Sequence, residues 1–368
     1  MVERIDDPFF AHEARAQAEH SCDQSSQPTT ALSEPNPFQV SWLLEPALRA
    51  FAPREDVEWF CVGPTQAPMD RTVMVRRFAY YGKPVPHWSL WQHDQSFLGT
   101  PLVTSGMEEA FWGALLDWCD ARAGPALFLH CPLQSLDGPV AAALIEVARK
   151  AGRPASVVMR HQRAMLRSRL SPEAYFSAST STGRRKEMRR QLRRLKEVGE
   201  VRFERRNDDT DLDAWIEHYH RLERSGWKGS AQSALSQSDA ATRFFRDALT
   251  GAARGGHLER LSLTLDHTPI AMLSTFIVPP GAFLFKTVYD EAYARFSPGV
   301  LLQQENLALL DRPEVTFTDS CAAQDHPMID RLWTERRMIG AINVAIGGRL
   351  RQAAAGRFFQ LDGGSESL

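Results

Sequence analysis

The sequence lacks the features of three broad protein classes. No apolar run approaches the roughly 20 residues that a membrane-spanning helix needs. The five cysteines are scattered and form no CxxC pair, which argues against a disulfide framework and against a structural zinc site. The formal net charge is only -2, so the chain as a whole has no drive toward nucleic acid or anionic membranes. We therefore expect a soluble protein of a reducing compartment, without a metal site.

The composition is that of a globular protein long enough for two packed units. The chain has 368 residues, of which 43% are apolar and 24% are charged. Its first residues are acidic and lack the apolar core of a secretory signal, so we expect a cytoplasmic location. Segments rich in Ser, Gln, Pro and Gly predict tails at 1–38 and 351–368, with folded units at 39–165 and 166–350.

Apolar periodicity predicts a mixed α/β architecture, because helical and strand patterns alternate along the chain. We expect helices at 41–51, 107–121, 139–151, 182–198, 212–224, 239–252 and 298–310. We expect strands at 57–62, 72–81, 126–131, 156–159, 201–206, 258–266, 269–278, 282–290 and 315–319. Three consecutive strands thus precede the last predicted helix.

The most informative motif is the segment 286–302, KTVYDEAYARFSPGVLL, in which a strand leads through a tight turn into a helix. Ser297 suits the N-cap, Pro298 suits the first turn, and Gly299 leaves the backbone approachable. The unpaired N–H groups at a helix start bind anions, and Arg295 adds a cation beside them. The segment is suited to a pyrophosphate, although an ordinary capped helix accounts for the same residues.

A basic helix is the second motif. Its cations are Arg184, Arg185, Lys186, Arg189, Arg190, Arg193, Arg194 and Lys196. Met188, Leu192 and Leu195 form a narrow apolar stripe at helical spacing. The helix is either a patch for phosphates, nucleic acid or an acidic polymer, or a solvated helix that packs one thin face. The second interpretation is favoured because the chain as a whole is not basic.

The helix at 212–224 and the loop after it carry two further signals. The loop sequence LERSGWKG presents Trp227 and Lys228, which suit either a ligand site or a helix end with the indole folded onto the core. Within the helix, His218 and His220 have HxH spacing. Two residues apart on a helix, they point to different faces, so a shared metal is not expected.

The last motif follows the strand at 315–319. Asp319 ends this strand, and Asp325, His326 and Trp333 follow on a less regular segment. A carboxylate beside an imidazole suits acid–base chemistry, whereas N-capping by Asp325 is the simpler interpretation.

Together, these segments resemble the CelD/BcsL-like acetyltransferases of the GNAT superfamily, which are related to FemAB-type transferases. The matching segments are STGRRKEMRRQLRRLKEVGEVRFE, LERSGWKG, RFFRDAL, PIAMLSTF, KTVYDEAYARFSPGVLL and the final D…D…W stretch. They cover about residues 170–337. The resemblance implies a GNAT-type fold, with an N-terminal GNAT-like half at 39–165 packed against the acetyltransferase domain at 166–350.

The resemblance also implies acetyl-CoA or another acyl-CoA as the donor. On this basis the cofactor-binding residues are Thr287, Val288, Arg295, Phe296, Ser297, Pro298, Gly299 and Val300. The common GNAT loop, [Q/R]xxGx[G/A], is altered in this chain. With Arg295 as its first residue, Pro298 and Val300 occupy the glycine positions.

The catalytic and substrate-binding residues follow from the same resemblance. Asp290 or Glu223 is the candidate base or acceptor-binding group, and Lys286 is expected near the acyl group. The candidate proton donors to the leaving thiolate are Tyr289 and Tyr293. The candidate substrate-binding residues are Trp227, Lys228, Asp319, Asp325 and Trp333.

The expected activity is transfer of an acyl group to an amine on a small-molecule or saccharide acceptor. Direct attack on the thioester requires positioning rather than a covalent intermediate, and the chain has no GxSxG motif. The associated setting is cell-surface polysaccharide or envelope metabolism. Two alternatives stay open: FemAB-like transfer from an aminoacyl-tRNA, and a non-catalytic accessory protein of polysaccharide biosynthesis. A plain nucleic-acid-binding module is disfavoured for want of stacking motifs.

Overall fold

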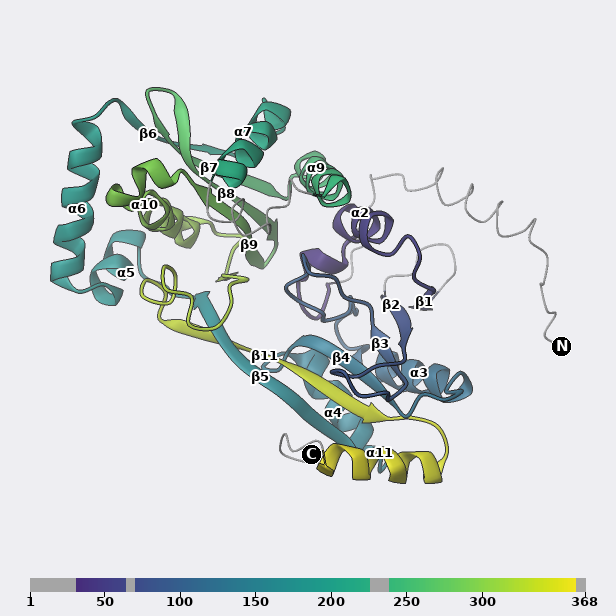
Figure 1. Cartoon of the computed structure of the whole chain (residues 1–368). Coiled ribbons are helices and arrows are strands. Elements are labelled where there is room, and N and C mark those ends of the chain that lie inside the picture. Colours follow the sequence, from purple (N-terminus) through teal and green to yellow (C-terminus); the bar gives the residue numbers. More distant parts are fainter. Residues whose placement is uncertain (1–30, 64–69, 226–237, 362–368) are drawn as a thin grey trace. The chain divides into compact units, whose positions relative to one another are not determined.

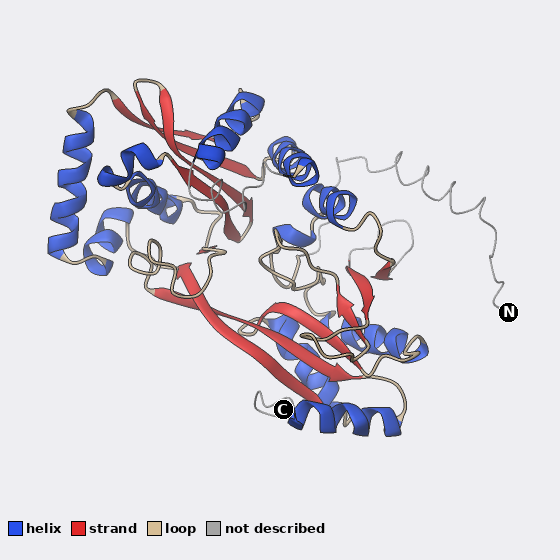
Figure 2. Cartoon of the chain, viewed as in Figure 1, coloured by secondary structure: helices blue, strands red, loops and turns tan. Residues whose placement is uncertain are grey.

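One mixed sheet organises the part of the chain that a computed structural model describes, residues 31–63, 70–225 and 238–361. Its eleven strands lie in the order β1-β2-β3-β4-β11-β5-β10-β9-β8-β7-β6 (Figures 1 and 2). The strands are β1 (Val57–Val62), β2 (Asp70–Arg77), β3 (His87–Leu90), β4 (Phe128–Ser135), β5 (Ala155–Leu166), β6 (Val201–Arg206), β7 (Leu258–Leu265), β8 (Thr268–Val278), β9 (Gly281–Tyr289), β10 (Phe317–Asp319) and β11 (Glu335–Ala345). The mixed α/β architecture expected from the sequence is confirmed.

The helices begin mostly where the sequence places them. The α-helices are α2 (Ser41–Phe51), α3 (Glu108–Ala121), α4 (Pro139–Lys150), α5 (Pro172–Ser179), α6 (Thr182–Lys196), α7 (Leu212–Ser225), α9 (Asp239–Arg254), α10 (Pro298–Glu305) and α11 (Arg349–Leu361). Short 3-10 helices are η1 (Pro37–Gln39), η3 (Glu291–Phe296) and η4 (Asn306–Asp311). Ser171, Ser181 and Ser238 cap α5, α6 and α9 through their side chains, as N-cap residues do.

Two long strands, β5 and β11, lie in the middle of the sheet, between β4 and β10. They pair antiparallel from Glu335↔Met165 to Val344↔Ala155, and run side by side in Figure 2. β11 also pairs with β4, and the last residues of β5 pair with β10. The sequence indicated only 156–159 of β5 and no part of β11. The predicted division between residues 165 and 166 lies at the end of β5 and stays a prediction.

β9 separates two apolar cores in the C-terminal part. Phe283 and Phe285 pack in the core that includes α2, α7 and α9, whereas Leu284 packs in the core that includes α10. The β8–β9 register shifts where Ser274 pairs with Lys286 but Thr275 pairs with Leu284, which is a β-bulge. The bulge brings the Lys286 ammonium within 5.3 Å of the Phe285 ring centroid.

Both predicted tails are partly folded. Asn36 is buried and its amide donates to the backbone of Leu98 and Thr100, so the folded part begins before residue 38. At the other end, α11 occupies residues that the sequence indicated as a tail. Its Phe359 ring packs 5.5 Å from that of Phe128, and this burial makes the segment helical. Residues 1–30 and 362–368 lie outside the described residues.

Candidate functional site

The central feature of the C-terminal part is the point where β9 and β10 separate. The two strands pair in parallel from Phe317↔Gly281 to Asp319↔Phe283, and there the pairing ends. β9 continues to Tyr289, whereas the backbone after β10 turns to β5, where the Ser320 N–H donates to Ala164 O at 3.1 Å. An extended ligand can bind along a strand whose neighbour diverges in this way.

The helix start that follows β9 differs from the expected cap. Pro298 lies in the first turn of α10, as predicted, but Ser297 makes no side-chain cap. Ser297 adopts a left-handed φ of 51°, and its hydroxyl accepts a hydrogen bond from Gln191 of α6 at 3.1 Å instead. The prediction that Ser297 caps α10 was therefore wrong, because its conformation directs the hydroxyl to a neighbouring helix.

Gly299 lies against two side chains at this helix start. A Cβ atom at Gly299 would meet Met328 Cε and Sδ at 3.2 Å and Tyr289 Cδ1 at 3.3 Å. The sequence suggested an approachable backbone here and gave no sign of Met328. Glycine thus allows the close approach of these side chains, and the flexible Met328 thioether covers the backbone.

A hollow of about 280 Å³ lies between α6 and η3, beside the start of α10. Its lining residues are Gln191, Arg194, Glu197, Val198, Arg295 and Phe296. Arg194 and Arg295 are exposed, and the Arg295 guanidinium lies 4.6 Å from the Phe296 ring centroid. Its two guanidinium groups outnumber the single carboxylate, that of Glu197, so the hollow is suitable for an anion.

Lys286 reaches the N-terminal part of the chain rather than α10. Its ammonium donates to Gln95 Oε1 and lies 4.9 Å from the Phe97 ring centroid. The neighbouring His93 imidazole is buried, and burial together with the Lys286 charge lowers the pKa of His93 to about 3. Lys286 is therefore held on the face of β9 that packs against α7 and α9.

A buried polar group on α7 lies on the same side of the sheet. Glu223 is 2% exposed, and its Oε2 is 3.9 Å from Nδ1 of His220, one helical turn earlier. Neither ring nitrogen of His220, nor the hydroxyl of Tyr219, has a hydrogen-bond partner among the described residues. Burial and the Glu223 charge raise the pKa of Tyr219. Sequence reasoning considered His220 only as a metal ligand with His218 and missed its spacing to Glu223.

The other predicted catalytic residues lie at the far end of β9. Asp290 caps η3, because its Oδ1 accepts the Ala292 N–H at 2.9 Å. Tyr289 and Tyr293 are half-buried and pack against the core that includes α10. Thr287 and Val288 pair with β8. The structure thus gathers Tyr289, Tyr293 and Gly299 on one face of β9, opposite Glu223 and Lys286.

The predicted substrate-binding residues are not gathered at one surface. Asp319 is fully buried between Arg163 and Arg337, so its carboxylate is committed to an internal ion cluster. Trp333 is a core residue with no exposed surface.

Asp325 is exposed and has a φ of 59°, and no helix begins there, so N-capping by this residue was a wrong interpretation. Its side chain lies 3.4 Å from the amide of Gln324. Trp227 and Lys228 lie outside the described residues.

Grouped metal ligands and membrane-spanning helices are both absent from the described residues. Among the described residues, no three His, Cys, Asp or Glu side chains are grouped to hold a metal ion. In the same part of the chain, no helix combines the length and the apolar character needed to span a membrane.

Comparison with known proteins places the matched segment around this site. Residues 182–325 match the family described as acetyltransferase (GNAT) domain. This segment includes α6, α7, the separation of β9 from β10, and α10. The chain therefore contains a segment that matches a GNAT domain, and this match covers less than half of its length. No curated protein matches the sequence significantly.

Solved structures share the fold at low sequence identity. FemX has 10% identity and a TM-score of 0.55, and the match covers 98% of this chain and 100% of FemX. A conserved protein from Bacteroides thetaiotaomicron VPI-5482 has 6% identity and a TM-score of 0.52, over 83% of this chain and 91% of that one. A DUF2156 domain from Agrobacterium fabrum has 11% identity and a TM-score of 0.51, over 88% and 98%. At these identities the similarity concerns the fold alone.

Proposed function

We propose that the protein is an acyl-CoA-dependent N-acyltransferase that acts on an amine-bearing acceptor. The observation that carries this proposal is the separation of β9 from β10 inside the segment that matches the GNAT domain. The pantetheine arm of an acyl-CoA is extended and carries polar amide groups at intervals, so it suits the edge of a strand whose neighbour diverges. Donor and acceptor would approach this opening from the two faces of β9.

The donor would be held on the α10 face of β9. Arg194 and Arg295 line the hollow beside α10 and suit the phosphates of coenzyme A. Pro298 and Val300 replace the glycines of the common loop, so fewer flexible backbone positions surround the phosphates, and the two arginines take a larger share of their binding. When bound, the acyl-CoA supplies an activated acyl group as a thioester.

The acceptor would be held on the opposite face, where Glu223 and Lys286 lie. Glu223 takes a proton from the acceptor ammonium, and His220 supports the Glu223 carboxylate from one turn away. Tyr289, which lies beside Gly299, would give a proton to the leaving thiolate. Lys286 orients the acyl end from the loop that contains Gln95. These roles require positioning and no covalent enzyme intermediate.

Donor binding is measured by thermal shift with CoA, acetyl-CoA and longer acyl-CoAs. A ligand that binds the native state stabilises it, by about 2.7 kcal/mol when its concentration is 100 times its Kd, and this stabilisation raises the melting temperature. We expect at least one acyl-CoA to do so. An unchanged melting temperature with every acyl-CoA would contradict the proposal.

A variant of Gly299 localises the donor site. Gly299→Leu should weaken acyl-CoA binding at least about tenfold, equivalent to 1.4 kcal/mol, because the new side chain displaces Met328 and Tyr289. Gly113→Leu is the matched control, since a Cβ at that helical glycine meets no atom within 4 Å. Equal affinity in both variants, measured by calorimetry, would remove the donor from this helix start.

For the acceptor, we propose a small molecule or saccharide that carries an amine and belongs to cell-surface polysaccharide metabolism. The support is the resemblance of the sequence to CelD/BcsL-like acetyltransferases.

The scattered cysteines, four of which are free in the described residues, favour the cytoplasm as the place where the protein acts. Turnover of acyl-CoA with any amino sugar would exclude a purely accessory role.

A second candidate function is transfer from an aminoacyl-tRNA, favoured by the exposed face of α6. Exposed cations on this helix include Lys186, Arg189, Arg193, Arg194 and Lys196, and the neighbouring Arg190 forms an ion pair with Glu187 of the same helix. Phosphate contacts make binding salt-dependent, with a slope near -0.7 per contact for single strands. Salt-sensitive tRNA binding that Arg189→Glu with Arg193→Glu abolishes would support this function. Acyl-CoA binding without tRNA binding would reject it.

A further inference from the structure

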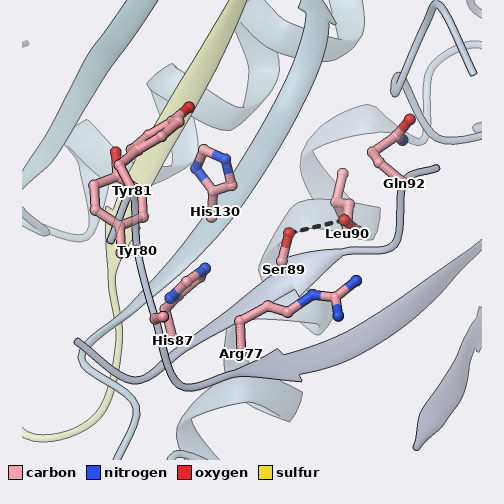
Figure 3. A pocket seen from close by; sticks show the side chains of 9 residues that line it. Arg77, Tyr80, Tyr81, His87, Ser89, Leu90, Gln92 and His130 are labelled. Carbon is pink, nitrogen blue, oxygen red and sulfur yellow. Dashed lines mark hydrogen bonds between the residues drawn. The ribbon is translucent and has the colours of Figure 1, made fainter. Parts of the chain in front are cut away.

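A second hollow lies in the N-terminal part of the chain, away from α10 (Figure 3). It has a volume of about 240 Å³. Its polar lining comes from β2, β3, β4, the loop between β2 and β3, and the segment that follows β3: Arg77, Tyr80, Tyr81, His87, Ser89, Gln92 and His130. In Figure 3 the two tyrosines and two imidazoles lie on one side of the hollow, and Arg77 and Gln92 lie on the other. It is located where β3 and β4, parallel neighbours over Trp88↔Leu129 and Ser89↔His130, cease to pair.

Hydrogen bonds fix the tautomers of both imidazoles. His87 Nδ1 is 3.0 Å from the Val85 carbonyl, which can only accept, so this nitrogen carries the proton. His130 Nδ1 is 2.7 Å from Asn343 Oδ1, whose amide nitrogen donates to the Tyr80 hydroxyl. Each neutral ring therefore presents an Nε2 lone pair. Neither Nε2 bonds to another described residue.

Burial keeps both rings neutral. It lowers the pKa of His87, and the nearby Arg77 charge acts in the same direction. Burial also lowers the pKa of His130, to about 4. Two uncharged acceptors therefore face a small hollow at neutral pH.

Gln92 adds an unsatisfied amide to the lining. Both its Nε2 and its Oε1 are buried, and neither has a hydrogen-bond partner among the residues that the structure describes. Leaving such groups unpaired costs about 1–3 kcal/mol each, so a rotation of the side chain that lets a bound hydroxyl group pair with them would be favourable. Arg77 does not make the hollow cationic, because its guanidinium pairs with Glu55 at 2.8 Å.

The rim of the hollow is aromatic. Tyr81 lines it and is 67% exposed. The volume is below the roughly 300–1,000 Å³ of pockets for drug-sized ligands, so it suits a single ring. A neutral pocket that offers lone pairs, one amide and an aromatic rim matches a ring that bears several hydroxyl groups. We propose that this pocket binds a single sugar ring through its hydroxyl groups, independently of the acyl transfer site.

The pocket is built on a rigid support, as a binding site requires. The Tyr80 ring is 2% exposed and contacts His87 and His130 at centroid distances of 5.3 and 5.4 Å. Behind it, Phe128 and Phe358 of α11 pack at 5.1 and 5.8 Å. The terminal helix thus holds the pocket wall in place.

The test adds glucose, glucosamine or N-acetylglucosamine to the full chain. Saturation-transfer difference NMR and calorimetry measure the binding. Adenine and inorganic phosphate are the comparison ligands. We expect at least one sugar to bind saturably at millimolar concentration. We expect neither comparison ligand to bind in this pocket. Tyr81→Ala should weaken the sugar about tenfold or more, whereas Phe78→Ala, exposed on the same loop but outside the lining, should not.

Gln92→Leu separates a binding role from a structural one. Replacing an unpaired buried amide with an apolar side chain should not lower the melting temperature, but it should abolish sugar binding. The proposal would be overturned by the absence of saturable sugar binding, or by a sugar affinity that Tyr81→Ala and Gln92→Leu leave unchanged from wild type. Adenine binding that these variants remove would overturn it as well. Acyl-CoA binding, measured in the same samples, reports on the transfer site separately.

Discussion

Glu223→Gln should lower the turnover number by roughly 10²–10⁴-fold, the usual contribution of a positioned general base. The amide keeps the size of the carboxyl group, so the variant should stay folded. It cannot take a proton from the acceptor ammonium. Steady-state kinetics with acetyl-CoA and an amino-sugar acceptor measure the effect, and thermal melting checks the fold.

The kinetic pattern separates proton transfer from simple acceptor binding. A base acts in the transition state, so its loss lowers kcat and kcat/KM together, whereas loss of a binding contact raises KM with kcat unchanged. Glu217→Gln is the matched control, because Glu217 is exposed on the same helix. Turnover of Glu223→Gln within twofold of that control would remove Glu223 from the mechanism.

The α7 and β7–β9 segments were predictable because each carries a strong local signal. α7 has a clear apolar stripe, and β7–β9 are apolar runs separated by turn residues. The turn at Asp266 and His267 has left-handed φ values of 48° and 65°, as two-residue hairpins require. Local chemistry was therefore sufficient to find the strand and helix that flank the site.

β11 and α11 were missed because their stability is tertiary. β11 lies between β4 and β5, and neither neighbour is close to it in sequence. α11 contains Gly356, which suggested a tail. A Cβ there would meet Pro154 Cγ at 3.2 Å, so this glycine allows the helix to approach the β5 end of the sheet. Such a reason is visible only once the two segments are side by side.

The site was harder to predict than the fold for the same reason. The strand-turn-helix segment at 286–302 identified β9 and α10, but not the side chains that cover them. Met328 packs against Gly299, and the Gln191 amide donates a hydrogen bond to the Ser297 hydroxyl. Both contacts join residues too far apart in sequence for a local pattern to predict. Asp319 was interpreted as a substrate-binding residue because it belongs to the D…D…W stretch of the family resemblance. Its partner Arg163 is 156 residues away in sequence.

Asp319→Ala should destabilise the protein by about 3–5 kcal/mol, the cost of breaking a buried ion pair by removing one partner. Its Oδ2 accepts from Arg163 at 2.6 Å and from Arg337 at 2.8 Å, and it has no exposed surface. Removal leaves two buried guanidinium groups with Glu34, 3.5 Å from Arg337, as the remaining acid. Urea unfolding measures the change.

A double variant and a surface control test the cause of this loss. Asp319→Leu with Arg163→Met removes one buried cation together with the anion and leaves Arg337 paired with Glu34, so it should recover much of the stability. Glu187→Ala, which breaks an exposed pair with Arg190, should change stability little. If the double variant is no more stable than Asp319→Ala, the loss comes from packing and not from uncompensated charge.

The pH dependence of stability gives an independent check on Asp319. Burial alone would raise the pKa of this carboxyl, but Arg163 and Arg337 outweigh burial, so its pKa is lowered in the folded protein. A lowered folded pKa means that the contribution is complete above the unfolded value of about 3.9 and is lost as pH falls below it. The difference in unfolding free energy between wild type and Asp319→Asn should therefore be constant from pH 5 to 7, about two units in which the carboxyl stays ionised, and shrink below about pH 4. A difference that stays constant into acid would mean that the carboxylate charge is not what holds Arg163 and Arg337 in the core.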